Sequence, residues 1–145
     1  MSLFGALSVS ASGLSAQRQR AELLVENMAN SETTRTPEGG PYRRKDAVFE
    51  SEQESSPFSA IFQGALNGGA TGVRVAQIVE DASEPDKRYM PGHPDADKDG
   101  YVAFPRSNPA EDMVDLMSAS RGYEGNVAAM SAVKNMIQSS IEIMK

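Results

Sequence analysis

Residues 108–144 read NPAEDMVDLMSASRGYEGNVAAMSAVKNMIQSSIEIM, and this stretch decides the fold. Its larger side chains recur in steps of three and four, which is the a/d pattern of a coiled-coil helix. Asn108 can cap this helix, Pro109 suits its first position, and Glu111 can complete a capping box. A helix of this length spans about 55 Å, so its stripe needs a partner helix from this chain or another copy. The stripe consists of Met113, Leu116, Ser120, Tyr123, Val127, Met130, Lys134, Ile137, Ile141 and Met144.

A second helix is predicted from about Ser2 to Asn30. Its first half is low in charge and rich in Ser, Ala and Gly, so it is a poor helix former on its own. Such a helix is marginal alone in water, so we expect it to order by packing. The other interpretation of the same pattern is an ordinary amphipathic core helix. The a/d row of this helix consists of Leu3, Leu7, Ser10, Leu14, Gln17, Ala21, Leu24 and Met28.

The middle of the chain, residues 31–107, predicts a small β element between the two helices. Pro and Gly residues break the helical pattern after Asn30 and again across residues 81–94, which we expect to form a loop. Residues 51–72 are polar and Gly-rich around one short apolar patch, 58–62. Three short strands are predicted at Tyr42–Phe49, Gly72–Glu80 and Gly100–Phe104. The predicted fold is mainly α with a small β insertion, in which helices 1–30 and 108–145 pair as a coiled-coil-like domain.

Composition excludes several classes of function. The formal net charge is −6, which disfavours general binding to nucleic acids or anionic membranes. The absence of cysteine removes disulfides, zinc–thiolate sites and cysteine nucleophiles. No apolar run approaches the length of a membrane span, and the N-terminus does not resemble a cleavable signal peptide. We therefore expect no cofactor, no membrane insertion and no enzymatic activity.

One motif has the pattern of a metal site. Asp95, Asp97, Asp99 and Gly100 match the first half of a calcium-binding EF-hand loop. Arg106 stands where that loop needs a bidentate Glu, so an acidic turn before a strand is the simpler interpretation. The single histidine, His93, lies in a Pro-Gly-His-Pro loop with no pattern of catalytic partners around it.

Two further features allow two interpretations each. The cluster Arg43-Arg44-Lys45 is typical of a solvated strand face or an interface charge, with nucleic-acid binding as the weaker alternative. Gly122 and Gly125 lie inside the long predicted helix, where glycine costs about 1 kcal/mol relative to Ala. They indicate either a close helix–helix contact or a bend, or are simply tolerated in a helix held by other contacts.

Several motifs resemble those of the flagellar axial proteins, and most closely those of a proximal-rod component. They are Ser-Ala-Ser-Gly-Leu-Ser-Ala-Gln-Arg at 10–18, Glu-Asn-Met-Ala-Asn-Ser-Glu-Thr-Thr-Arg-Thr at 26–36, and Tyr-Glu-Gly-Asn-Val at 123–127. A further motif is Gly39, Gly40, Pro41, Tyr42, Arg43 and Arg44, and Asp99-Gly100-Tyr101-Val102 supports the same resemblance. The resemblance covers roughly residues 1–50 and 91–145, in matching order.

The resemblance implies a structural subunit of the bacterial flagellar rod that transmits torque from the basal ring to the hook. It implies helical assembly with other copies and with other rod proteins, contact with the basal ring, and delivery by the flagellar type III export apparatus. On this basis we expect the assembly interface to consist of Leu3, Leu7, Leu14, Leu24, Met28, Met113, Leu116, Tyr123, Val127, Met130, Ile137 and Ile141. The alternative function is a soluble coiled-coil adaptor with a weak calcium-responsive turn at 95–99.

Overall fold

A computed structural model describes residues 3–52 and 71–143 of the chain. In the described part, one long helix precedes and another follows two β-hairpins along the sequence. This order agrees with the predicted mainly α fold. The elements are α1 (Leu3–Ala29), β1 (Lys45–Ser51), β2 (Val73–Glu80), β3 (Asp86–Tyr89), β4 (Tyr101–Phe104) and α3 (Pro109–Ile143). The apolar patch predicted at 58–62, Ser2 and Met144 lie outside the described residues.

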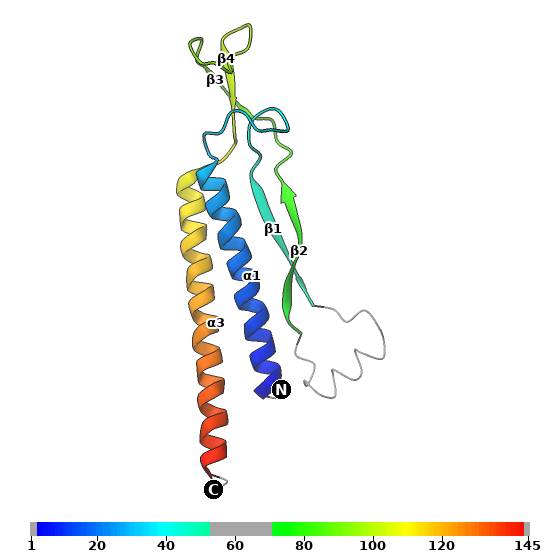
Figure 1. Ribbon diagram of the computed structural model, residues 1–145, viewed down its shortest axis with the longest axis vertical. Helices are drawn as coiled ribbons and strands as arrows, with labels where there is room; N and C mark the ends of the chain where they lie inside the picture. The colour runs from blue at the N-terminus through cyan, green and yellow to red at the C-terminus, as the bar shows by residue number, and fades with distance from the viewer. Residues whose placement is uncertain (1–2, 53–70, 144–145) are drawn as a thin grey trace, which may run out of the picture.

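The two helices lie side by side and run in opposite directions, as Figure 1 shows. α1 has 27 residues and α3 has 35. The predicted cap of α3 is confirmed, because Asn108 Oδ1 accepts a hydrogen bond from the backbone N–H of Ala110 at 3.1 Å. Glu111 and Asp112 in the first turn place negative charge at the positive end of the helix dipole.

Small side chains set the register of the helix pair. A Cβ placed on Gly13 would lie 3.0 Å from the side chain of Asn126, and one on Gly122 would lie 3.2 Å from Gln17. These contacts place Leu3 about level with Met136, so the last two turns of α3 extend past the start of α1 (Figure 1). The close-contact interpretation therefore applies to Gly122. A Cβ on Gly125 would meet no other described atom within 4 Å.

The face that α3 turns toward α1 is displaced from the predicted stripe. The buried residues of α3 are Asp112, Ala119 and Val133. The predicted stripe begins one residue further along, and Met113, Tyr123, Val127 and Ile141 are exposed. Small residues on the contact face let the two backbones approach closely, which leaves the larger apolar side chains on the flank and outer side of α3.

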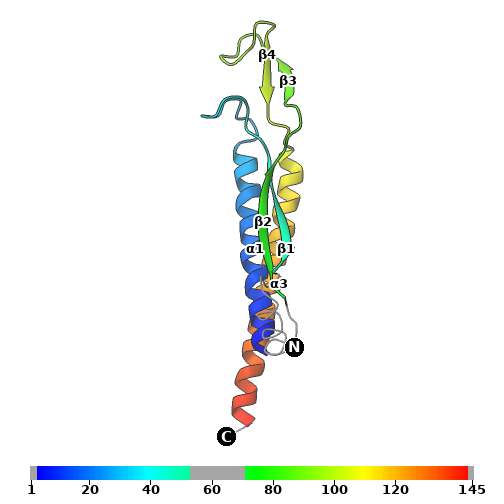
Figure 2. The same cartoon turned by 90° about the vertical axis from the view of Figure 1, so that its right-hand side faces the viewer.

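The first hairpin, β1–β2, lies alongside α1 (Figures 1 and 2). Its antiparallel register pairs Lys45 with Glu80 and Ser51 with Val73, with an irregularity between Val48 and Phe49. The predicted strands at 42–49 and 72–80 correspond to β1 and β2. β1 begins later than predicted because Tyr42 and Arg44 turn their side chains toward the helices.

The second hairpin, β3–β4, lies beyond the end of the helix pair at which α1 ends and α3 begins (Figure 1). The prediction that residues 81–94 form only a loop was wrong, because Asp86–Tyr89 pairs with Tyr101–Phe104. Arg88 stacks over the Phe104 ring at 4.7 Å, and the rings of Tyr89 and Tyr101 meet edge to face at 5.4 Å. The described part thus has two separate hairpins where the sequence predicts three strands.

Apolar burial within the described residues is limited. The buried apolar side chains there are Ala16, Leu24, Tyr42, Val102, Phe104, Ala119 and Val133. So small a core contributes little stability to a chain of this length. No helix in the described ranges has a run of residues long and apolar enough to cross a membrane.

Candidate assembly interface

The predicted interface residues fall into three classes of exposure. Exposed apolar side chains on a stable element mark a surface for another molecule when they form a patch. Leu24 is buried, and six residues are half-buried: Leu7, Leu14, Met28, Leu116, Met130 and Ile137. The exposed residues are Leu3, Met113, Tyr123, Val127 and Ile141.

α3 exposes further apolar side chains that the predicted stripe does not contain. They are Val114, Met117, Met136 and Ile143, and Ile143 is 85% exposed. The signal for them was present in the sequence as apolar residues off the a/d row. Together with the exposed stripe residues, they leave large apolar side chains on more than one side of α3 without intrachain cover.

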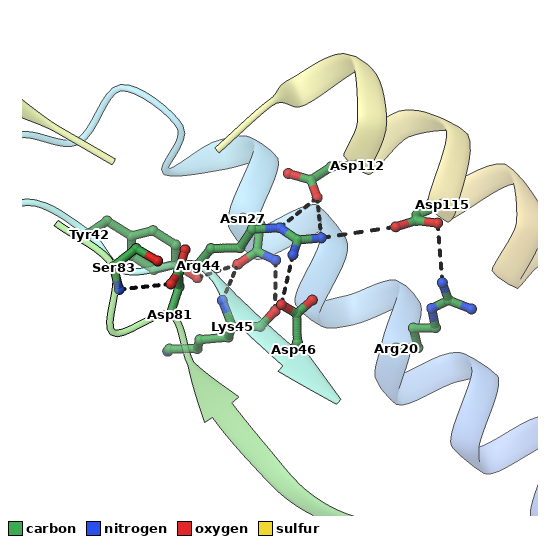
Figure 3. Close-up of polar contacts among 10 residues, drawn as sticks. All are labelled: Arg20, Asn27, Tyr42, Arg44, Lys45, Asp46, Asp81, Ser83, Asp112 and Asp115. Carbon is green, nitrogen blue, oxygen red and sulfur yellow. Dashed lines mark hydrogen bonds and ion pairs between the residues drawn. The ribbon is translucent and has the colours of Figure 1, made fainter. Parts of the chain in front are cut away.

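A set of polar contacts, which we call the strand anchor, fixes β1 to α1 (Figure 3). Asn27 on α1 is completely buried. Its Nδ2 donates to the Lys45 carbonyl at 2.8 Å, and its Oδ1 accepts from the Lys45 N–H at 2.9 Å. The amide thus pairs with β1 as a neighbouring strand would. Lys45 Nζ also contacts Glu26 Oε1 at 2.7 Å.

Tyr42 completes the strand anchor. Its hydroxyl donates to Asn27 Oδ1 at 2.9 Å. Burial, reinforced by the nearby carboxylate of Glu26, raises the pKa of Tyr42 to about 12. The hydroxyl therefore stays protonated and remains a donor over the whole physiological range.

A second set of contacts, the ion-pair cluster, joins the segment entering β1 to both helices (Figure 3). Arg44 donates to one oxygen of the fully buried Asp112 from Nε at 3.1 Å and from Nη2 at 3.0 Å. Its Nη1 donates to Asp46 at 2.7 Å. Asp115 links the cluster to α1 through Arg20, at 3.2 Å. Burial alone would lower the pKa of Arg44, but these carboxylates raise it.

The cluster explains the motif at residues 39–44. Gly39 and Gly40 adopt positive φ values of 93° and 79°, which residues other than glycine rarely adopt. This turn, followed by Pro41, directs Tyr42 and Arg44 toward the helices and leaves Arg43 exposed. Arg44 and Lys45 are therefore used inside the chain, and a free basic patch for nucleic acid is not formed by them. Sequence patterns missed Asn27 and Asp112, because both are polar residues that lie beside the predicted apolar rows and not on them, where a solvent-facing side chain is expected.

In the acidic turn at 95–99, the carboxylates of Asp95 and Asp97 accept hydrogen bonds within the chain. Asp97 Oδ1 accepts from the N–H groups of Asp99 at 2.9 Å and Tyr101 at 2.8 Å. Asp95 accepts from the Thr34 hydroxyl at 2.8 Å. His93 Nδ1 accepts from the Asp95 N–H at 3.1 Å. These contacts stabilise the turn, and no group of three potential metal ligands occurs in the described ranges.

Several known proteins are similar to this chain over its full length or nearly so. The chain is 41% identical to the flagellar basal-body rod protein FlgC of Borreliella burgdorferi, covering 100% of this chain and 99% of that protein. It is 43% identical to FlgC of Bacillus subtilis, with 100% of both chains covered. The chain belongs to the FlgC family. Another FlgC relative, from Escherichia coli O6:H1, is 38% identical and covers 99% of this chain and 98% of its own.

A family model matches the C-terminal part of this FlgC-family chain. Residues 98–143 match the model described as flagellar basal body rod FlgEFG protein C-terminal. This range contains β4 and the whole of α3, so it includes the exposed apolar side chains and Asp112.

Proposed function

We propose that this chain is a structural subunit of the flagellar basal-body rod. The full-length similarity to FlgC proteins supports the rod. The observation that carries the structural role is the helix pair, whose α3 exposes large apolar side chains along its length. A subunit surrounded by neighbours buries such side chains. In a monomer they stay exposed to water, which is unfavourable in free energy.

In this proposal the helix pair forms the axial part of the subunit. The stripe residues that the single chain leaves exposed pack, in coiled-coil fashion, against other copies and against other rod proteins. Contacts between different surfaces of identical subunits do not close on themselves, and they produce helical assemblies. Such an assembly would transmit torque from the basal ring to the hook across the periplasm.

The same proposal accounts for the weak core. Delivery through the flagellar type III export apparatus requires an unfolded chain, and this chain has no cysteine to form a disulfide. A chain with little apolar burial unfolds readily and gains stability when neighbours bind its folded form. The basal ring and the export apparatus are therefore proposed partners. The calcium-responsive adaptor has no observation in its favour.

One substitution tests the assembly role directly. Val127 is 42% exposed on α3, so Val127→Asp should leave the isolated chain folded while placing a charge in a buried subunit contact. We expect loss of this protein from purified basal bodies and loss of swimming motility. Ala128→Asp is the matched control, because it adds the same charge one residue away, off the stripe.

Immunoblots of purified basal bodies and swimming in soft agar give the two readouts. Export is measured separately, since an exported but unassembled Val127→Asp chain is the specific expectation. Normal incorporation and motility of Val127→Asp would contradict the assignment of this face. Absence of the unmodified chain from basal bodies would contradict the proposed function itself.

A further inference from the structure

Two polar contacts hold the hairpin β1–β2 against α1, one at each end of the hairpin. The first is the strand anchor, in which Asn27 binds both backbone groups of Lys45 at the start of β1. At the other end, Ser12 Oγ accepts a hydrogen bond from the Val73 N–H at 3.0 Å. The same hydroxyl donates to the Val9 carbonyl at 2.8 Å. We call this second contact the serine pin.

The separation of the two contacts matches the length of the hairpin. Ser12 and Asn27 stand about 22 Å apart along α1. From Lys45 to Ser51, β1 rises by about 20 Å, and Ser51 pairs with Val73 at the start of β2. The hairpin therefore reaches along α1 from one contact to the other (Figure 1).

The hairpin itself buries little apolar surface. On each strand only the first and third residues are half-buried, and the others are exposed. They are Lys45 and Ala47 in β1, and Val73 and Val75 in β2. Because so few apolar side chains are covered, the hydrogen bonds at the two ends fix the position of the hairpin on the helix.

The serine pin requires glycine at position 72. A Cβ on Gly72 would lie 2.7 Å from Ser12 Oγ and 2.8 Å from Glu52 Oε2. It would also lie 3.1 Å from the Ser12 Cβ, which cannot rotate away. The missing side chain thus lets the start of β2 approach α1 closely enough for Val73 to reach the hydroxyl.

The pin meets α1 in the part of the helix that is weakest by sequence. Residues 3–15 contain no charged side chain, and two glycines and four serines lower their helix propensity. At the same level α3 contacts the other side of α1, since a Cβ on Gly13 would lie 3.0 Å from the Asn126 side chain. The helix is therefore held from two sides at Ser12 and Gly13.

We propose that β1–β2 is a brace for the N-terminal half of α1, and that Ser12 is the positioning residue through which it acts. A helix frays inward from its end, and the pin stops this fraying at Ser12. The single chain then presents an ordered α1 to whatever molecule packs against it. This inference goes beyond the rod function and does not depend on it, because the brace lies within one chain.

Amide-resolved hydrogen exchange of the purified full chain tests the brace. Ser12→Ala removes the acceptor of the Val73 N–H, so the Val73 amide should lose its protection. Exchange of residues 8–16 should also rise by about fivefold, the factor that one hydrogen bond of ordinary strength supplies. Residues 22–29, which the strand anchor holds, should change by less than about twofold.

Ser8→Ala is the matched control. Ser8 is exposed on the same stretch of α1, and the substitution brings the same gain in helix propensity as Ser12→Ala. Exchange of residues 8–16 should therefore stay equal or become slower in the control. Equal exchange in the two variants, or a rise spread evenly over α1 and α3 in Ser12→Ala, would overturn the brace.

The strand side of the pin provides a second test. Gly72→Ala should raise exchange of residues 8–16, whereas Gly92→Ala should not, because a Cβ on Gly92 meets no other described atom within 4 Å. Adding Gly72→Ala to Ser12→Ala should change little further, since both substitutions break one contact. Fully additive effects would overturn the brace, as would unprotected residues 8–16 in the unmodified chain. Incorporation of the unmodified chain into basal bodies is measured separately and decides only the rod function.

Discussion

At the scale of single residues, the ion-pair cluster gives the sharpest expectation. Arg44→Ala leaves Asp112 buried and charged with no cation beside it, and removing one partner of a buried pair costs about 3–5 kcal/mol. We therefore expect the free energy of unfolding to fall by about 3 kcal/mol in urea titrations. Arg43→Ala changes the exposed neighbour and should fall within about 0.5 kcal/mol of the unmodified chain.

The mechanism can be separated from simple loss of side-chain volume. Adding Asp112→Asn to Arg44→Ala removes the uncompensated charge, so the double variant should recover part of the lost stability. If Arg44→Ala and Arg43→Ala had equal effects, the proposed importance of the buried pair would be wrong.

Tyr42 predicts a pH dependence. Its pKa is raised to about 12 from the ordinary 10.0. Between these pH values the unfolded chain loses the phenolic proton while the folded chain keeps it, so stability falls as pH rises. The contribution is complete below pH 10, and its loss by pH 12 is on the order of 2 kcal/mol. Tyr42→Phe should remove this part of the pH dependence.

The variant should also be less stable at pH 8, by about 1 kcal/mol, because Asn27 loses the hydroxyl donor. Urea midpoints at pH 8 and pH 11 provide the measurement. Tyr89→Phe serves as control, since Tyr89 is exposed and should change neither value. If the stability of the Tyr42→Phe chain fell with pH above 10 as steeply as that of the unmodified chain, the raised pKa of Tyr42 would not be the cause of this fall.

At the scale of elements, the two glycines of α3 provide a matched pair. A Cβ on Gly125 meets no other described atom within 4 Å, so Gly125→Ala should stabilise the isolated chain by up to about 1 kcal/mol through helix propensity. At Gly122 the new Cβ lies 3.2 Å from Gln17, so Gly122→Leu should separate the helices and lower the melting temperature. Thermal denaturation followed by circular dichroism measures both. If the two substitutions shifted the melting temperature in the same direction and by a similar amount, the register of the helix pair would be wrong.

Both helices were predictable from their length and periodicity, and α3 also from its N-terminal cap. The face between them was not, since Gly13, Gly122 and Asn126 give no apolar signal and their contact depends on close approach of two backbones. β3 was missed because Asp86-Lys87-Arg88-Tyr89 has no alternation of apolar residues, and backbone pairing with β4 orders it. The motif at 39–44 was recognisable as a pattern. Its partner Asp112, 68 residues further along the chain than Arg44, was not.

At the scale of the whole molecule, the proposed rod function rests on apolar side chains that the single chain leaves exposed. The described residues have a small core, while α3 carries apolar side chains over most of its length without cover. Such a chain gains much of its stability from neighbours. The helices should therefore be far more stable in the assembled rod than in the free subunit.

Hydrogen exchange of backbone amides in the free chain and in purified basal bodies tests this claim most directly. Faster exchange along α1 and α3 is expected in the free chain than in purified basal bodies, with the largest gain of protection at residues 137–143. Equal, strong protection in the two states would mean a self-sufficient helix pair, and it would contradict assembly as the source of helix stability.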